Sequence, residues 1–301
     1  MTPPVLDVPS GRPAGISSPD PGDPRLERLA VNQRTLRQWS LREVVQGCAR
    51  RGVGAVGLWR EPVHELGVAT CARLVRDAGL RVSTYCRGGF LTGPDHRAAL
   101  QDNRRAIDEA AELGASCLVM VVGGLPEGSR DLSGARQAVT EGVAELAPYA
   151  AQRGVRLGLE PLHPVFCADR SVLCSLSQAL DLADEIALDS GPPAGEVGVV
   201  VDAYHVWWDP DLASQVTRAG RAGRVFSFQT CDWILPLPAD TLLGRGIPGD
   251  GHIDLRGLRQ LVDTAGYGGD IEVEVFNADV WAADGAAVLD TIVRRHIQQV
   301  L

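Results

Sequence analysis

Residues 197–210 (VGVVVDAYHVWWDP) constrain the fold of this chain more than any other stretch. Apolar residues and a glycine lead directly into Asp202, and His205 follows three positions later. A run this apolar is typical of a strand buried on both faces, as in a parallel sheet covered by helices. Its polar residues come where the strand ends, and ligands bind at the carboxyl edge of barrels and open α/β sheets. The stretch therefore predicts an α/β fold with a site near Asp202.

Short β-rich segments alternate with helical patterns along most of the chain. The predicted strands are residues 29–36, 53–59, 81–87, 117–123, 156–162, 197–206, 225–232 and 270–276. The predicted helices are residues 41–51, 67–78, 95–113, 132–153, 176–189, 212–219, 255–265 and 285–300. Glycines suited to a left-handed helix end follow five of these helices, at positions 52, 79, 114, 154 and 266. This alternation predicts a (β/α)8 TIM barrel, with a doubly wound open sheet as the alternative.

Two segments stand apart from this alternation. Residues 1–24 are rich in proline and glycine and are expected to form a disordered or loosely docked arm, which leaves residues 25–301 for a single barrel domain. Residues 233–251, after the seventh strand, contain proline and glycine throughout and are expected to form a functional loop over the site.

Composition excludes several classes of function. A net charge of −9, with 29 Lys and Arg scattered along the chain, disfavours nucleic-acid binding. No apolar run reaches the ~20 residues of a membrane span, and no secretory signal pattern is present at the amino terminus. Seven cysteines without a CxxC pair are expected to be reduced core residues, which favours a cytoplasmic protein. The expected partner is a small molecule, and the sequence is compatible with a homo-oligomer.

Side-chain alternation along the later strands points polar residues to the interior of the barrel. The inward positions include Glu160, Asp202, Gln229 and Glu274, whereas Phe226 and Phe228 face the helices; Glu272 faces inward one layer deeper, where a structural role is expected. A single acid at a strand end is often a helix cap or a salt-bridge partner. Three carboxylates converging in one buried mouth repel each other, and a divalent cation such as Mg²⁺ or Mn²⁺ relieves this repulsion.

Several motifs carry a resemblance to the xylose isomerase-like barrel superfamily, which includes sugar isomerases and epimerases, inositol-catabolic enzymes and endonuclease IV. They are LEPLHP at 159–164, VDAYHVWWDP at 201–210, FQTCDW at 228–233, GRGIPGDGHIDL at 244–255 and IEVEVF at 271–276. The similarity spans residues 29–301. It implies one divalent metal ion held by Glu160, Asp202, Gln229 and Glu274, with Co²⁺ or Zn²⁺ as alternatives to Mn²⁺ or Mg²⁺. Gln229 stands where the family has histidine, and its neutral amide oxygen is the weaker ligand.

Five further residues are candidates for substrate binding: His205, Arg245, His163, Trp59 and Arg87. His205 and Arg245 resemble family residues that contact substrate oxygens. His163, three residues after Glu160, is a candidate for a substitute ligand, and Trp59 for a wall against a sugar ring. Arg87 is a candidate partner for a carboxylate or phosphate. Loop packing remains the alternative explanation for each of them.

The resemblance implies an isomerase or epimerase acting on a small sugar, ketose or cyclitol. Glu160 would remove a proton next to a carbonyl to give an enediolate, and Glu274 would return it. The same first step followed by loss of a β-substituent would make the protein a dehydratase or a lyase on a keto-sugar or keto-glycoside. A non-catalytic barrel subunit, its metal site eroded at Gln229, is a third interpretation, and an endonuclease IV-like repair function conflicts with the acidic charge. No glycine-rich phosphate-binding loop is present, which favours an unphosphorylated substrate.

Overall fold

A closed barrel forms the centre of the molecule. The computed structural model describes residues 19–190 and 197–301, and within them eight parallel strands close in the order β1-β10-β7-β6-β5-β4-β3-β2. Since β1 pairs with β10 on one side and with β2 on the other, the open-sheet alternative is wrong. The barrel strands are β1 Leu29–Asn32, β2 Ala55–Trp59, β3 Arg81–Gly89, β4 Leu118–Val121, β5 Leu157–Leu159, β6 Val197–Asp202, β7 Val225–Thr230 and β10 Ile271–Val273.

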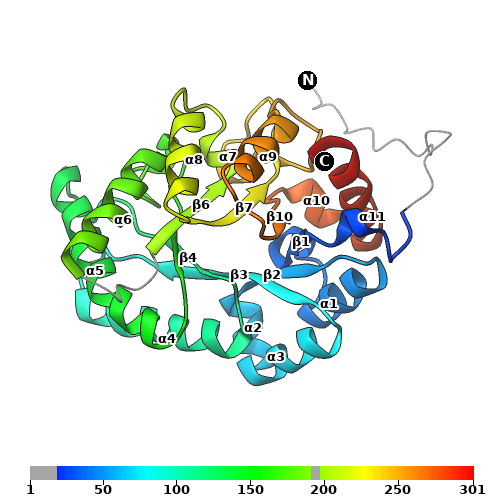
Figure 1. Ribbon diagram of the computed structural model, residues 1–301, viewed down its shortest axis with the longest axis horizontal. Helices are drawn as coiled ribbons and strands as arrows, with labels where there is room; N and C mark the ends of the chain where they lie inside the picture. Colours follow the sequence, from blue (N-terminus) through cyan, green and yellow to red (C-terminus); the bar gives the residue numbers. More distant parts are fainter. Residues whose placement is uncertain (1–18, 191–196) are drawn as a thin grey trace.

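Helices form an outer ring around these strands (Figure 1). Ser40 and Glu43 make a reciprocal capping box at the start of α1, and Gly114 ends α4 in the left-handed conformation. All five glycines predicted at helix ends have positive φ. In the described parts of the chain, no helix has the length and apolarity needed to cross a membrane. The helices are α1 Leu41–Arg50, α2 Arg60–Leu66, α3 Val68–Asp77, α4 His96–Leu113, α5 Leu132–Gln152, α6 Leu176–Ser190, α7 Ala203–Val206, α8 Leu212–Arg221, α9 Leu255–Thr264, α10 Ala278–Ala282 and α11 Gly285–Arg295, which continues into a π-helical turn at His296–Val300.

Most strands are shorter than predicted, and two of them, β1 and β6, end where a polar side chain turns the chain. Asn32 accepts a hydrogen bond from the Arg34 amide, and the 3₁₀ helix η2 (Gln33–Leu36) begins there. Asp202 does the same for the Tyr204 amide, so β6 stops and α7 begins. Both turns lie at the carboxyl ends of their strands and help to build the mouth of the barrel.

The segment predicted as a long loop after β7 has structure of its own. A short antiparallel pair, β8 (Asp232–Trp233) and β9 (Arg245–Gly246), encloses the 3₁₀ helix η4 (Thr241–Leu243). This pairing brings Arg245 back to the mouth of the barrel. Most of the predicted arm, residues 1–18, lies outside the described residues. Its last part packs against the turn that follows α1, since a Cβ on Gly52 would collide with the Pro21 backbone.

A small apolar cluster fills the barrel interior, separate from the larger core between strands and helices. It consists of Cys86, Cys117, Val119, Val200 and Phe226. Phe226 was expected on the outer face, but the register between β6 and β7 shifts so that Val199 pairs with Val225 and Val200 with Ser227. The resulting bulge turns Phe226 inward, whereas Phe228 stays in the outer core. All seven cysteines are free, and five of them are buried.

Candidate active site

Three buried carboxylates meet at the carboxyl ends of barrel strands. Glu160 follows β5, Asp202 ends β6, and Glu274 follows β10. Their exposed fractions are 5%, 1% and 4%. Burying charged groups without partners is costly, so their surroundings must supply positive charge, hydrogen bonds or protons.

Arg245 supplies positive charge to two of these carboxylates. Its Nη1 donates to Asp202 Oδ2 at 2.9 Å and to Glu274 Oε2 at 3.0 Å. The side chain is buried, and its guanidinium group lies 4.9 Å from the centre of the Tyr204 ring and 5.1 Å from that of Phe276. Arg245 was expected to contact substrate oxygens; here its guanidinium group bridges two of the residues predicted to hold the metal.

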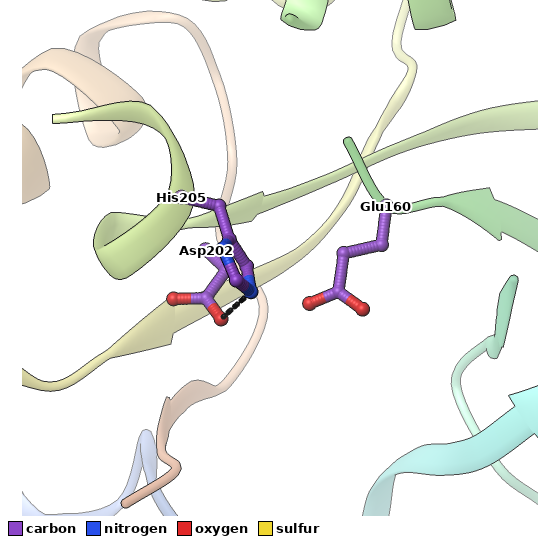
Figure 2. A group of neighbouring side chains, drawn as sticks. All are labelled: Glu160, Asp202 and His205. Atoms are coloured by element: carbon purple, nitrogen blue, oxygen red, sulfur yellow. Dashed lines mark ion pairs between the residues drawn. The ribbon is translucent and has the colours of Figure 1, made fainter. Parts of the chain in front are cut away.

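Glu160 is the carboxylate without such a partner. Among the described residues its side chain forms no hydrogen bond and no ion pair, and its carboxylate points toward Asp202 and His205 (Figure 2). One potential ligand atom from each of these three residues lies within 4.8 Å of the others. A buried carboxylate with no protein donor has both oxygens available for a ligand or a proton.

The pKa values of the carboxyl groups follow from this arrangement. Burial raises the pKa of Glu160 well above its usual value, and the negative charges of Asp202 and Glu274 raise it further. Burial also raises the pKa of Glu274, to about 8, against the lowering effect of Arg245. The pKa of Asp202 is raised by burial and lowered again by Arg245. Carboxyl groups with raised pKa values in a concave site are suited to general acid–base chemistry.

His205 presents a ring N–H to the site. Its Nδ1 accepts a hydrogen bond from the His163 amide at 3.1 Å, and burial holds its pKa well below the usual value, so the ring is neutral. A neutral imidazole that accepts at Nδ1 carries its proton on Nε2. Nε2 is therefore a donor, and it lies 3.0 Å from Nη2 of Arg245, which is also a donor. A ligand oxygen that accepts hydrogen bonds from both nitrogens would relieve this contact between two donors.

Gln229 lies at the base of the site and is oriented by Glu272. Its Nε2 donates to Glu272 Oε1 at 3.1 Å, which leaves its Oε1 as a buried acceptor without a donor. Glu272 is fully buried and also accepts from Asn32, Ser83 and Thr84. Both hydroxyls of β3 can face inward because its register against β2 shifts at this point. No local sequence pattern indicated this hydrogen-bond network. The sequence predicted only that Glu272 faces the barrel interior one layer below Glu274.

The other candidate residues lie around this centre. The His163 ring packs against Trp208 and Trp233, and its Nδ1 accepts from the Val165 amide. His163 thus contacts the site through its main chain, by way of His205, and its side-chain contacts give no support to a role as substitute ligand. Trp59 and Arg87 line a cavity of about 210 Å³. Three more arginines of this cavity, at positions 34, 37 and 170, were not singled out in the sequence: Arg34 and Arg37 follow β1, and Arg170 lies far along the chain, after β5.

The residues present fit a divalent cation. Oε1 of Gln229 and Oε1 of Glu274 are buried acceptors without donors among the described residues. A cation would satisfy such oxygens, and the carboxylates would neutralise it. His205 is the weaker candidate ligand, because coordination through Nε2 would require it to give up the hydrogen bond from the His163 amide. Arg245 would compete with the cation for Asp202 and Glu274.

The fold and the site together define a (β/α)8 barrel with an acidic centre at its carboxyl-terminal mouth. Its sequence matches the model of the xylose isomerase-like TIM barrel family over residues 45–292, and the chain belongs to that family. No protein with a curated description matches the chain significantly.

Solved structures of similar proteins agree with this assignment. Protein SMc04130 from Sinorhizobium meliloti 1021 is 44% identical, with a TM-score of 0.86 over 91% of this chain and 98% of that one. An IolI protein whose structure contains a zinc atom is 18% identical, with a TM-score of 0.76 over 91% and 98% of the two chains. The 3-keto-D-glucoside 4-epimerase YcjR from E. coli is 19% identical, with a TM-score of 0.70 over 89% and 97%. The last two show likeness of fold.

Proposed function

We propose that this chain is a metal-dependent isomerase or epimerase that moves a proton at a carbon next to a carbonyl group in a small polyhydroxylated compound. The observation that carries the proposal is the pair Glu160 and Glu274. These buried carboxyl groups come from different strands, share one mouth and have raised pKa values. The epimerase YcjR, which has the same fold, supports the choice of reaction.

Glu160 is the better candidate for the group that first removes the proton. It has no hydrogen-bond donor among the described residues, so neither oxygen is tied to the protein. Glu274 is held by Arg245 through one oxygen, while its other oxygen is free to deliver a proton. Two such groups on different sides of a planar enediolate would permit removal from one face and return to the other.

His205 and Arg245 would hold an oxygen of the substrate. The Nε2–H of His205 and Nη2 of Arg245 lie 3.0 Å apart and both donate. A carbonyl or hydroxyl oxygen accepting from both would resolve that contact and place the adjacent carbon near Glu160. Hydrogen-bond donors aimed at an oxygen on which negative charge develops stabilise an enediolate-like transition state.

A divalent cation is the proposed cofactor, held by Glu160, Asp202, Glu274 and the amide oxygen of Gln229. When bound, it would polarise the carbonyl and an adjacent hydroxyl and so acidify the C–H between them. The zinc atom in the IolI protein structure supports a metal site in this fold, and Mn²⁺ or Mg²⁺ suits the oxygen-rich donor set here.

Deuterium exchange tests the proposal without knowledge of the product. The protein is incubated in D₂O with Mn²⁺ and a panel of ketoses, keto-glycosides and ketocyclitols, and each compound is followed by NMR. We expect deuterium at a carbon next to the carbonyl of at least one compound, and no exchange with Glu160→Gln. An alkene or a released aglycone would assign the reaction to a dehydratase or lyase. An absence of exchange across the panel, together with no metal uptake, would favour a non-catalytic subunit.

A further inference from the structure

A second feature lies at the same mouth as the carboxylates. A cavity of about 210 Å³ is lined by residues that follow several barrel strands, including Trp59 at the end of β2, Arg87 near the end of β3 and Phe276 after β10. This volume is below the ~300–1,000 Å³ typical of sites for drug-sized ligands, so it suits a small metabolite. The residues that line this cavity have no role in the reaction proposed above.

The charge of this cavity is opposite to that of the whole chain. Four arginines line it, at positions 34, 37, 87 and 170, against the single carboxylate of Glu61. The full chain carries a net charge of −9. Four guanidinium groups around one small cavity repel each other unless negative charge is brought between them.

The protein itself supplies only part of that negative charge. Arg34 pairs with Glu61 at 2.9 Å, and Arg170 lies 3.5 Å from Asp169. Among the described residues, Arg37 and Arg87 form no ion pair. Arg37 is exposed, but Arg87 is half-buried, and burial lowers its pKa from the usual value. The carboxylate of Glu61 attracts Arg87 but is already paired with Arg34, so a ligand anion would offset the cost of burying this guanidinium group.

Both unpaired arginines are stacked on aromatic rings. The guanidinium group of Arg87 lies 4.1 Å from the centre of the Phe90 ring, and that of Arg37 lies 5.0 Å from that of Trp281. Stacking uses the face of the planar guanidinium group and leaves its N–H groups pointing outward in the plane. That fork matches the oxygens of a carboxylate or phosphate. The rings therefore orient these donors before any ligand arrives.

The cavity adjoins the carboxylate centre. Phe276 lies between them, because its ring is 5.1 Å from the guanidinium group of Arg245 and 5.6 Å from the ring of Trp59. A molecule that reached past Phe276 would have its reacting carbon near Glu160 and Glu274 and its other end among the arginines.

We infer that the substrate carries an oxyanion group, a carboxylate or a phosphate ester, which the arginines of the mouth bind while the carbonyl end reaches the carboxylates. This rests on the proposed function and adds a substrate class to it. It also revises the expectation of an unphosphorylated substrate, since guanidinium groups can bind a phosphate without a glycine-rich loop.

Binding of three related compounds tests the inference separately from turnover. D-fructose, D-fructose 6-phosphate and 5-keto-D-gluconate are six-carbon keto compounds that differ in charge, and their dissociation constants are measured by calorimetry at one fixed ionic strength. We expect at least one of the two anions to bind about tenfold or more tightly than fructose. The phosphate ester binding better would indicate a phosphorylated substrate, and the keto acid binding better a sugar acid.

Three substitutions localise the effect. Arg87→Gln should remove most of the preference for the anion, and Arg37→Gln, at an exposed position where folding is not at risk, should reduce it several-fold. Arg221→Gln removes the same charge from an exposed position on α8 and should leave the preference unchanged. Circular dichroism checks that each variant is folded.

The outcomes separate this inference from the proposed function. Fructose binding as tightly as both anions, no measurable binding of either anion, or a preference that survives in both pocket variants would overturn the inference. Deuterium exchange into fructose at the rate seen with the anions would leave the proposed function standing and remove the need for a charged group. Tight anion binding without exchange into any compound would support the charged pocket and count against the isomerase.

Discussion

Substituting Arg245 by methionine tests whether the guanidinium group serves as the cation between two buried carboxylates. Nη1 is shared by Asp202 and Glu274, and the side chain is 2% exposed. Removing one partner of a buried ion pair costs about 3–5 kcal/mol, because the other partner is left without a counter-charge. At about 2 °C per kcal/mol for a chain of this size, the metal-free variant should melt roughly 6–10 °C below the wild type.

A divalent cation should restore much of this loss, because the two carboxylates that held Arg245 become free to bind it. Two unit charges ~4 Å apart interact by about 4 kcal/mol at an effective dielectric constant of about 20. Recovery of a third of that energy corresponds to about tenfold in affinity. We therefore expect Mn²⁺ to bind at least about tenfold more tightly to Arg245→Met than to the wild type and to raise its melting temperature more, although deuterium exchange is lost.

A surface arginine with the same number of partners provides the control. Arg218 contacts both Asp181 and Asp184, but its side chain is 37% exposed. Because exposed ion pairs contribute about 0–1 kcal/mol, Arg218→Met should melt close to the wild type and bind metal unchanged. The assays are thermal melts with EDTA and with Mn²⁺, and competition titration of the metal. Equal melting temperatures for the two variants, or Mn²⁺ affinity unaltered in Arg245→Met, would refute the reasoning.

Three further predictions concern the residues around Arg245. Glu160→Gln and Glu274→Gln should each abolish deuterium exchange in a protein that stays folded, and Glu160→Gln, which breaks no ion pair among the described residues, should melt near the wild type; exchange at near-native rate in either variant would contradict the two-base assignment. Gln229→His should tighten divalent metal binding and shift preference toward Co²⁺ or Zn²⁺, measured by competition titration, and unchanged affinity for every metal would place position 229 outside the coordination shell. Glu272→Ala should cost roughly 2–5 kcal/mol in urea unfolding, because the amide groups of Asn32 and Gln229 lose their acceptor, and Glu272→Gln should cost less than half as much. Equal costs for the two Glu272 variants would contradict this reasoning, because glutamine keeps one acceptor oxygen and leaves no cavity.

The barrel could be predicted from the sequence because its signals are local. A strand buried on both faces is visible as an apolar run, and a left-handed helix end is visible as a glycine, as at Gly114. The acids at the strand ends are local signals too, since Glu160, Asp202 and Glu274 each follow an apolar segment. The structure brings these three side chains to one mouth; their catalytic and metal-binding roles stay predictions.

Features that depend on strand register or on contacts between distant segments could not be predicted from the sequence in the same way. Alternation fails wherever a strand bulges, and one bulge turned Phe226 into the barrel while another let Ser83 and Thr84 both reach Glu272. The position of Arg245 depends on the pairing of β8 with β9 across a loop in which only the abundance of proline and glycine had been noted from the sequence. The arginine cavity gathers residues from segments that are far apart in the sequence, none of which carries a pattern by itself.

Gln229 shows how a departure from a family pattern can keep its physical role. A neutral histidine has one N–H and one lone pair on its ring nitrogens, so it can donate to a deeper carboxylate and ligate a cation at the same time. Gln229 offers the same arrangement of one donor and one acceptor. Its amide nitrogen donates to Glu272, and its amide oxygen is left as a buried acceptor without a donor. Nε2 must face the Glu272 carboxylate, since two oxygens there would repel, and this fixes the orientation of the amide. An eroded metal site would have no reason to keep an oriented and unsatisfied acceptor, because a buried acceptor without a partner costs about 1–3 kcal/mol. The amide oxygen therefore favours a working site for a harder ion over a site that has lost its metal.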